Sequence, residues 1–189
     1  MVLRLATGNP HKLREYAVLL EGVELAGLPE GFTMPPEDGD SFAANALIKA
    51  RALAAATGET AIADDSGICV PRLGGDPGIR SARWAGEDAT DEENLELLLE
   101  RTEPGDELEY ACVIAWVDPA TGAEETFEGR CHGRRAAEPR GEGGFGYDPD
   151  FEADEAPGRT MAELAPGEKD EISHRGHAAR SFLAWLEGR

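Results

Sequence analysis

Two adjacent carboxylates follow a short apolar run in the stretch Ala61-Ile62-Ala63-Asp64-Asp65-Ser66-Gly67. The apolar residues predict the end of a buried strand, and Gly67 permits a sharp exit that would place the polar side chains at its mouth. Neighbouring carboxylates repel each other, and a divalent cation that prefers oxygen ligands is the usual solution. The same residues are also good turn formers, so a solvated turn is the commoner role of this stretch taken alone.

The lysines give a second chemical signal. Of 18 basic residues only three are lysines, namely Lys12, Lys49 and Lys169. Each lies beside a segment with unusual composition, and a lysine is a compact point charge that suits a phosphate. A codon bias toward arginine, with three lysines left by chance on the surface, explains the same count.

The first of these segments resembles an anion site. A predicted strand over Val2–Ala6 and a predicted helix from Pro10 to about Leu20 flank a turn made of Thr7, Gly8, Asn9, Pro10, His11 and Lys12. Asn9 is a suitable N-cap, and the helix N-terminus directs its dipole and N–H groups at a ligand. The turn is not a Walker A loop, and many α/β proteins begin in this way without binding anything.

The remaining elements must position the other polar residues. Ser41 is a good N-cap for a helix from Phe42 to about Ala56, on which Asn45 and Lys49 share one face. That face lines either a cleft or the solvent. Further strands are predicted at Val23–Leu28, Ile68–Val70, Leu108–Val117 and Glu125–Cys131, with a Thr90-capped helix at Asp91–Glu100.

A glycine-rich stretch, Gly141 to Pro149, surrounds the aromatic residues Phe145 and Tyr147. It suits a loop that holds a ring against a flat ligand such as a base, although a flexible hairpin tip is the alternative. His174 and His177 enter a last helix that runs to about Leu186. Their spacing lacks the partner carboxylate of known zinc motifs, which favours cleft donors or helix capping.

The length and the net charge of the chain limit the classes of protein to which it can belong. The 189 residues suit one domain, possibly with two lobes, and no apolar run is long enough for a membrane span. The N-terminus has no signal-peptide layout, so we expect a cytoplasmic protein. A net charge of -20 argues against a nucleic-acid partner. Cys69, Cys112 and Cys131 lack metal-type spacing and are expected to be buried thiols.

Taken together, six motifs in order resemble the inosine triphosphate pyrophosphatase family over nearly the whole chain. They are Leu5-Ala6-Thr7-Gly8-Asn9 with Lys12, Ser41-Phe42 with Asn45-Ala46 and Lys49-Ala50, Ala63-Asp64-Asp65-Ser66-Gly67, Pro77-Gly78 with Ser81-Ala82-Arg83, Gly144-Phe145-Gly146-Tyr147-Asp148-Pro149, and Ser173-His174-Arg175-Gly176. Each motif is weak alone, but the six in this order are specific.

The resemblance implies an elongated α/β fold over residues 1–189, with a long mixed twisted sheet, flanking helices, two lobes, a cleft between them and a homodimer. It implies magnesium-dependent hydrolysis of non-canonical purine triphosphates (ITP, dITP and XTP) to the monophosphate and pyrophosphate. Asp65 would be the base and a metal ligand, with Glu37 as the second carboxylate. The triphosphate would contact Thr7 to Lys12 with help from Lys49 and Lys169, and Ser66 would contact the substrate. The stretch Phe145-Gly146-Tyr147-Asp148 would hold the base, with Phe145 stacked on it, and His174 and Arg175 would read the edge of the base.

Two departures from the family pattern concern residues near the motifs. Ala44 stands where many members have glutamate, and Arg80 stands where bacterial members commonly have tyrosine. Glu37 is aligned only loosely, which bears on the number of metal ions. The alternatives are a pyrophosphatase for another modified or canonical nucleotide and a nucleotide-binding module without turnover.

Overall fold

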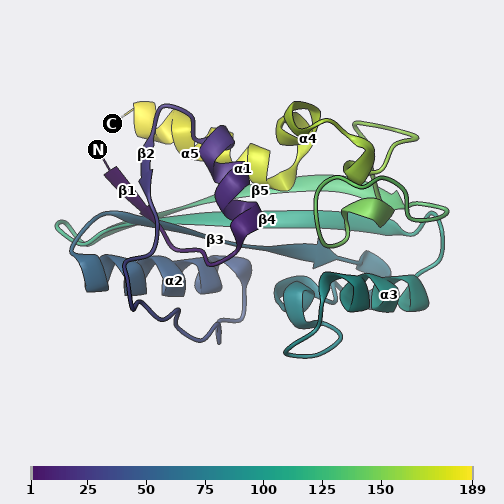
Figure 1. The fold of residues 1–189 in the computed structure, drawn as a ribbon, viewed down its shortest axis with the longest axis horizontal. Helices are drawn as coiled ribbons and strands as arrows, with labels where there is room; N and C mark the ends of the chain where they lie inside the picture. The colour runs from purple at the N-terminus through teal and green to yellow at the C-terminus, as the bar shows by residue number, and fades with distance from the viewer. Residues whose placement is uncertain (1, 189) are drawn as a thin grey trace. The chain divides into compact units, whose positions relative to one another are not determined.

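The structure is a computed structural model that describes residues 2–188, and its helices and strands alternate along the chain (Figure 1). In chain order they are β1 (Val2–Leu5), α1 (Pro10–Leu19), β2 (Glu24–Ala26), α2 (Phe42–Thr57), β3 (Ala61–Cys69), α3 (Asp91–Arg101), β4 (Glu107–Asp118), β5 (Ala123–Arg135), β6 (Phe151–Ala153), α4 (Pro166–Ile172) and α5 (His174–Glu187). None of these helices is long and apolar enough to cross a membrane.

The strands form one six-stranded sheet in the order β2-β1-β3-β4-β5-β6. β1 pairs in parallel with β2 and β3, whereas β5 pairs with β6 in an antiparallel manner. The sheet is therefore mixed, which confirms the predicted α/β class. The chain divides into two compact units, the first formed by Met1–Asp65, Cys112–Gly129 and His177–Arg189, and the second by Ser66–Ala111 and Arg130–Gly176.

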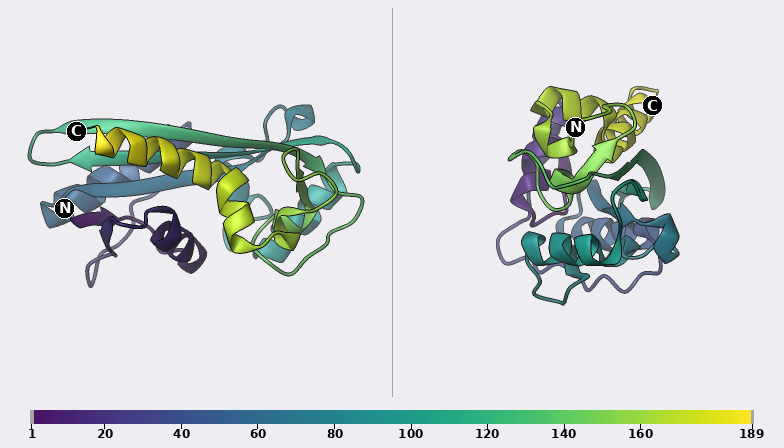
Figure 2. Two further views of the ribbon diagram at one scale, coloured as in Figure 1. Left: turned by 90° about the horizontal axis from the view of Figure 1, so that it is seen from above. Right: turned by 90° about the vertical axis from the view of Figure 1, so that its right-hand side faces the viewer.

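The first unit buries both faces of its part of the sheet. Side chains of successive strand residues point to opposite faces. Ile62, Ile114 and Trp116 pack with α1 and with Phe182 of α5. On the other face, small residues of β3 and β4 pack against Ala46, Ala50 and Leu53 of α2. Figure 1 shows α1 and α2 on opposite sides of these strands, and Figure 2 shows α5 lying along them.

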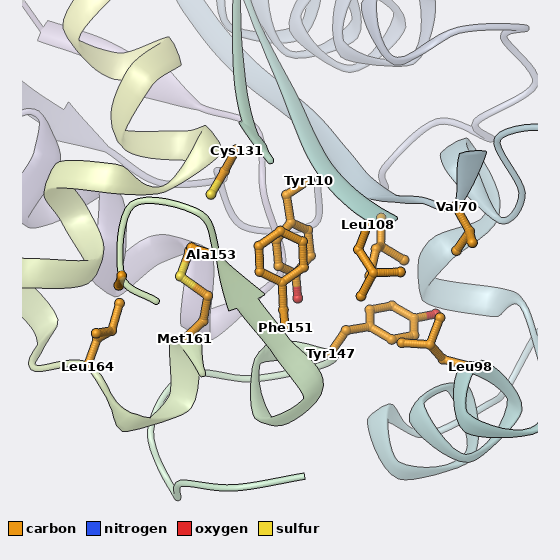
Figure 3. Packing of buried hydrophobic residues seen from close by; sticks show 12 residues of the cluster. Val70, Leu98, Leu108, Tyr110, Cys131, Tyr147, Phe151, Ala153, Met161 and Leu164 are labelled. Carbon is orange, nitrogen blue, oxygen red and sulfur yellow. The ribbon is translucent and has the colours of Figure 1, made fainter. Parts of the chain in front are cut away.

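The second unit has its own core, drawn in Figure 3. Tyr110 of β4 stacks on Phe151 of β6, with ring centroids 4.4 Å apart. Leu98 of α3 and Tyr147 belong to the same cluster. This packing holds α3 and the segment around Tyr147 against the strands.

One sequence prediction about β3 is wrong. The strand does not end at Ala63 but continues through the two aspartates to Cys69, so the stretch is neither a strand mouth nor a solvated turn. Gly67 makes no sharp exit. A Cβ on Gly67 would lie 2.3 Å from Ser81 Oγ and 2.4 Å from the Gly78 carbonyl oxygen, so this glycine allows a loop to approach the strand closely.

The predicted helix starts are confirmed. The Asn9 side chain caps α1, Ser41 caps α2, and Thr90 forms a capping box with Glu93 at α3. Near the C-terminus, the sequence predicted one last helix. The structure has two helices there, the short α4 and, after Ser173, α5. β5 also extends four residues beyond the predicted end at Cys131.

Candidate functional site

The two adjacent aspartates lie on a strand, and this explains how their repulsion is relieved. Consecutive strand residues face opposite sides of a sheet. Asp64 therefore meets Lys12 of α1 at 2.8 Å, whereas Asp65 meets Lys49 of α2 at 3.2 Å. Both aspartates are almost fully buried. Each carboxylate has its own lysine, so the pair needs no shared cation to coexist.

Lys49 also joins Asp65 to the acidic loop. Its Nζ lies 2.7 Å from Oε1 of Glu37, so two carboxylates converge on one ammonium group. The amide Nδ2 of Asn45 donates to Asp65 Oδ2 at 3.2 Å, and its Oδ1 accepts from the Gly39 N–H. Asn45 thus faces the aspartate and not the solvent, which resolves the alternative left open by its spacing on the helix. We refer to Lys12, Glu37, Lys49, Asp64 and Asp65 as the lysine–carboxylate cluster.

Burial and charge shift the proton affinities in this cluster. Burial raises the pKa of Asp65, Lys49 opposes that shift, and Glu37 adds to it. For Lys49, burial alone would lower the pKa, but Asp65, Asp64 and Glu37 together raise it. Lys49 therefore remains charged, while Asp65 holds a proton more readily than an exposed aspartate.

The N-terminus of α1 is already capped by its own residues. Asn9 Oδ1 accepts the N–H groups of His11 at 2.8 Å and of Lys12 at 3.3 Å, and Thr7 Oγ1 accepts the N–H of Asn9. Three of the backbone donors expected to meet an anion thus have side-chain acceptors. The charge of Lys12 and the helix dipole remain as attractive groups for a phosphate.

Carboxylate oxygens in the cluster fit a hard cation. Among residues 2–188, no group of three or more His, Cys, Asp or Glu side chains is arranged to hold a metal ion. Glu37 and Asp65 nevertheless converge on the position taken by the Lys49 ammonium. Two carboxylates together with substrate phosphates are the ligands by which proteins usually bind Mg²⁺, so these residues fit that ion.

In the second unit, Asp148 organises the glycine-rich loop. Its Oδ2 accepts the Phe145 N–H at 2.9 Å and contacts Lys169 Nζ at 2.7 Å, while Oδ1 accepts the Tyr110 hydroxyl at 3.1 Å. Gly144 has a φ of +70°, and a Cβ there would lie 2.1 Å from Asp148 Oδ2. Glycine is therefore required for this turn around the carboxylate.

The Phe145 ring is flanked by positive groups. Lys169 Nζ lies 5.2 Å and Arg175 Cζ 5.8 Å from the ring centroid. Arg175 is buried, and it donates to Ser66 Oγ at 2.9 Å. The structure thus brings together Phe145, Lys169, Arg175 and Ser66, four residues that the sequence predicted to contact the substrate. We refer to Phe145, Asp148, Lys169, His174 and Arg175 as the Phe145 cluster.

Two predicted substrate residues are packed among aromatic rings. His174 stacks on Tyr110 with centroids 4.6 Å apart and an interplanar angle of 13°. Tyr147 is buried, and its hydroxyl donates to the Ser81 carbonyl at 2.7 Å. Tyr147 therefore anchors the loop to the core of the unit, and the neighbouring Phe145 is the half-exposed aromatic ring.

Sequence reasoning missed several contacts of these clusters. Tyr110 occupies an ordinary apolar position of a strand, and nothing in its spacing points to Asp148. Asp91 was interpreted only as part of a structural helix, but its Oδ2 accepts the Gly146 N–H at 3.1 Å. The contact of Lys169 with Asp148 was also not expected, since Lys169 was grouped with the other lysines as a triphosphate ligand.

These features define an α/β protein with a buried lysine–carboxylate cluster in one unit and an aromatic cationic cluster in the other. The Ham1 family model matches residues 3–185, and the chain belongs to this family. It is 48% identical to the dITP/XTP pyrophosphatase of Cutibacterium acnes, with 98% of each chain covered. It is 50% identical to the dITP/XTP pyrophosphatase of Symbiobacterium thermophilum, covering 97% of this chain and 94% of that one.

A solved structure agrees with the fold. The HAM1 protein from Coxiella burnetii superposes with a TM-score of 0.88 at 38% identity, and all of both chains is covered. Together with the family match, this confirms the resemblance that the six sequence motifs indicated.

Proposed function

We propose that this chain hydrolyses dITP, XTP and related non-canonical purine nucleoside triphosphates to the monophosphate and pyrophosphate. The relatives named dITP/XTP pyrophosphatase support it over nearly the full length of the chain. The observation that carries the proposal is the lysine–carboxylate cluster, in which the partly exposed Lys12 and the buried Lys49 each contact one of two adjacent buried carboxylates. Phosphoryl transfer requires mainly positioning and charge neutralisation, and this cluster has the groups for both.

In this proposal the triphosphate binds near the N-terminus of α1. Lys12 and Lys49 supply positive charge, and the turn from Thr7 to His11 supports the phosphates together with the helix dipole. A triphosphate would take over part of the interaction that each lysine now has with an aspartate. The prediction that Lys169 assists at the phosphates remains open alongside its contact with Asp148.

Asp65 acts as the general base. A water oxygen attacks the α-phosphorus, the water proton passes to the Asp65 carboxylate, and the bond from the α-phosphorus to the bridging oxygen breaks as pyrophosphate leaves. Asn45 and Lys49 donate to its two oxygens and fix the orientation of the carboxylate.

Glu37 and Asp65 are the residues that would hold Mg²⁺. When bound, the ion neutralises phosphate charge and lowers the pKa of a coordinated water.

The Phe145 cluster binds the base. Phe145 stacks on the purine, the stretch Gly146 to Asp148 shapes the loop, Ser66 contacts the substrate, and His174 and Arg175 read the base edge. Hypoxanthine and xanthine have a 6-oxo group that accepts a hydrogen bond, where the 6-amino group of adenine donates one. A buried donor such as Arg175 is left without an acceptor by adenine, which disfavours it.

We further propose that the enzyme works in the cytoplasm, that it forms a homodimer, as the resemblance implies, and that it has no nucleic-acid partner. The net charge of -20 supports the last point.

A pyrophosphate-release assay with magnesium tests the activity. Inosine, xanthosine, adenosine and guanosine triphosphates are compared at equal concentration, with dITP as a fifth substrate. Pyrophosphate from the inosine and xanthosine forms, and little from the others, is the expected result. Release of orthophosphate instead would place the attack at the γ-phosphorus and contradict the proposed reaction. Tight binding without product would favour a nucleotide-binding module.

A further inference from the structure

A further buried ion pair, Arg135–Asp150, lies next to the glycine-rich stretch Gly141–Pro149, which we call the Phe145 loop. Asp150 has no exposed surface, and its Oδ2 lies 3.2 Å from Nε of Arg135, whose side chain is 11% exposed. No described residue donates a hydrogen bond to the other oxygen, Oδ1. None of the site roles proposed above uses this pair.

The pair is connected to the loop through the backbone. Asp150 donates its N–H to the Tyr147 carbonyl at 3.0 Å, and its own carbonyl accepts the N–H of Ala136 at 2.8 Å. Only Pro149 separates it from Asp148, whose carboxylate holds the Phe145 N–H and Lys169. A displacement of Asp150 is therefore transmitted to the carboxylate that sets the position of the Phe145 ring.

Both ends of helix α3 are connected to the stretch Gly146–Asp150, the first end directly and the second through Arg135. At its start, Asp91 accepts the N–H of Gly146 at 3.1 Å. At its end, the Thr102 carbonyl accepts Nη1 of Arg135 at 2.6 Å, and Arg135 in turn contacts Asp150. The stretch from Gly146 to Asp150 is thus braced at two points against one helix.

The pair is expected to contribute little net stability to the fold. Burial raises the pKa of Asp150 to about 6 although Arg135 opposes the shift, so ionisation of this carboxylate is disfavoured in the folded protein. Buried ion pairs are often no more stable than apolar residues of similar volume, whereas their directional contacts fix one arrangement. An apolar pair would fill the space without defining where Asp150 lies.

We propose that the Arg135–Asp150 pair positions the Phe145 loop and thereby sets the affinity for the purine base. Both residues are positioning residues, because they act through Asp148 and do not touch the substrate. The inference rests on the proposed function for its kinetic consequence. A loosened loop weakens binding in the ground state and the transition state alike, so KM rises while kcat is retained.

The test compares Asp150→Asn with Asp154→Asn. Asp154 forms an aspartate–arginine contact with Arg134, the neighbour of Arg135 on β5, at 2.9 Å, but both side chains are about half exposed. We expect Asp150→Asn to raise KM for dITP about tenfold with kcat within about twofold of the parent. Asp154→Asn is expected to leave both constants unchanged. A folded Asp150→Asn protein with the parental KM would overturn the proposal.

A double variant covers the case in which Asp150→Asn does not fold. Arg135→Met combined with Asp150→Leu removes both charges and leaves no buried ion without a partner, so we expect a folded protein. Its KM is also expected to rise about tenfold, since the directional contacts are gone. A parental KM in this variant would show that packing alone positions the loop, against the proposal.

Amide hydrogen exchange separates failure of this inference from failure of the proposed function. Residues 141–149 should exchange faster in either pair variant than in the parent or in Asp154→Asn, whatever the protein hydrolyses. If the parent releases no pyrophosphate from any nucleotide, the proposed function fails, and the exchange result alone decides whether the pair positions the loop. Unchanged exchange in a folded variant would refute the positioning role.

Discussion

The two clusters have net charges of opposite sign. In the lysine–carboxylate cluster, three carboxylates face two ammonium groups, and the excess is negative. In the Phe145 cluster, one carboxylate faces Lys169 and Arg175, so the excess is positive without counting His174. The first arrangement is suited to a cation that accompanies a polyanion, and the second to an electron-rich ring and its oxo group.

The difference also concerns what the buried carboxylates do. Asp65 accepts hydrogen bonds from the side chains of Asn45 and Lys49, which orient its carboxylate for the proposed proton transfer. Asp148 accepts a backbone N–H of its own loop, so its main effect is on loop shape. We therefore expect changes in the first cluster to act on turnover and changes in the second to act on binding.

The largest expected effect is that of Asp65→Asn. The amide retains the shape of the side chain but accepts no proton, so kcat should fall by roughly 10²–10⁴-fold, the usual range for a positioned general base. Nucleotide binding, measured by calorimetry, should persist because the lysines remain. The surface substitution Asp154→Asn is the control. Turnover within a few fold of the parent would refute the assignment of Asp65.

The next largest expected effect is the pH dependence of the free energy of unfolding that the buried carboxyl group of Asp150 causes. The folded-state pKa of Asp150 is about 6 against an ordinary value of 3.8. Its contribution to stability is therefore fully present below about pH 4 and is lost as the pH rises through about 6. The loss amounts to about 3 kcal/mol, at 1.36 kcal/mol for each pKa unit.

Chemical unfolding at several pH values measures this loss. The free energy of unfolding of the parent, minus that of Asp150→Asn, should fall by about 3 kcal/mol between pH 4 and pH 7. Subtraction of the variant removes the contribution of groups that titrate in both proteins. A difference that stays flat with pH would mean that Asp150 titrates normally.

Much of the fold was predictable because its signals are local. The N-caps Asn9, Ser41 and Thr90 mark helix starts by chemistry that involves only neighbouring residues. β3 was predicted too short for the same reason, because Asp64 and Asp65 are strong turn formers by local preference. Lys12 and Lys49, which lie far away in sequence, neutralise them and allow the strand to continue.

The site was predictable as a set of residues but not as a set of contacts. The six motifs contain Asp65, Lys49 and Phe145, which lie in the two clusters, yet no spacing rule pairs Tyr110 with Asp148 or Arg135 with Asp150. Those partners come from different strands and loops, and the pairing depends on how the second unit packs. The three cysteines are free thiols as predicted, but Cys69 is only partly buried and not buried as expected.

A third prediction asks whether the Phe145 cluster acts on binding alone. Stacking of an aromatic side chain on a base contributes about 1–3 kcal/mol, so Phe145→Ala should raise KM by roughly tenfold to a hundredfold with kcat nearly unchanged. Phe145→Trp retains a stacking surface and should keep KM closer to the parental value. If kcat fell as steeply in Phe145→Ala as in Asp65→Asn, the division between the two clusters would be wrong.

The smallest expected effect is on base selectivity in Arg175→Ala. Arg175 is buried and contacts both Ser66 and the Phe145 ring, so its loss also affects packing. Selectivity is therefore measured as the ratio of kcat/KM for inosine triphosphate to that for adenosine or guanosine triphosphate, since any general loss of active protein cancels within one variant. We expect the ratio against adenosine triphosphate to fall by about tenfold, the value of one hydrogen bond to a charged donor. Arg134→Ala, an exposed arginine of the same unit, should leave the ratio unchanged. An unaltered ratio in Arg175→Ala would assign discrimination of the 6-oxo group to another donor, for which His174 and the backbone of the Phe145 loop are then the candidates.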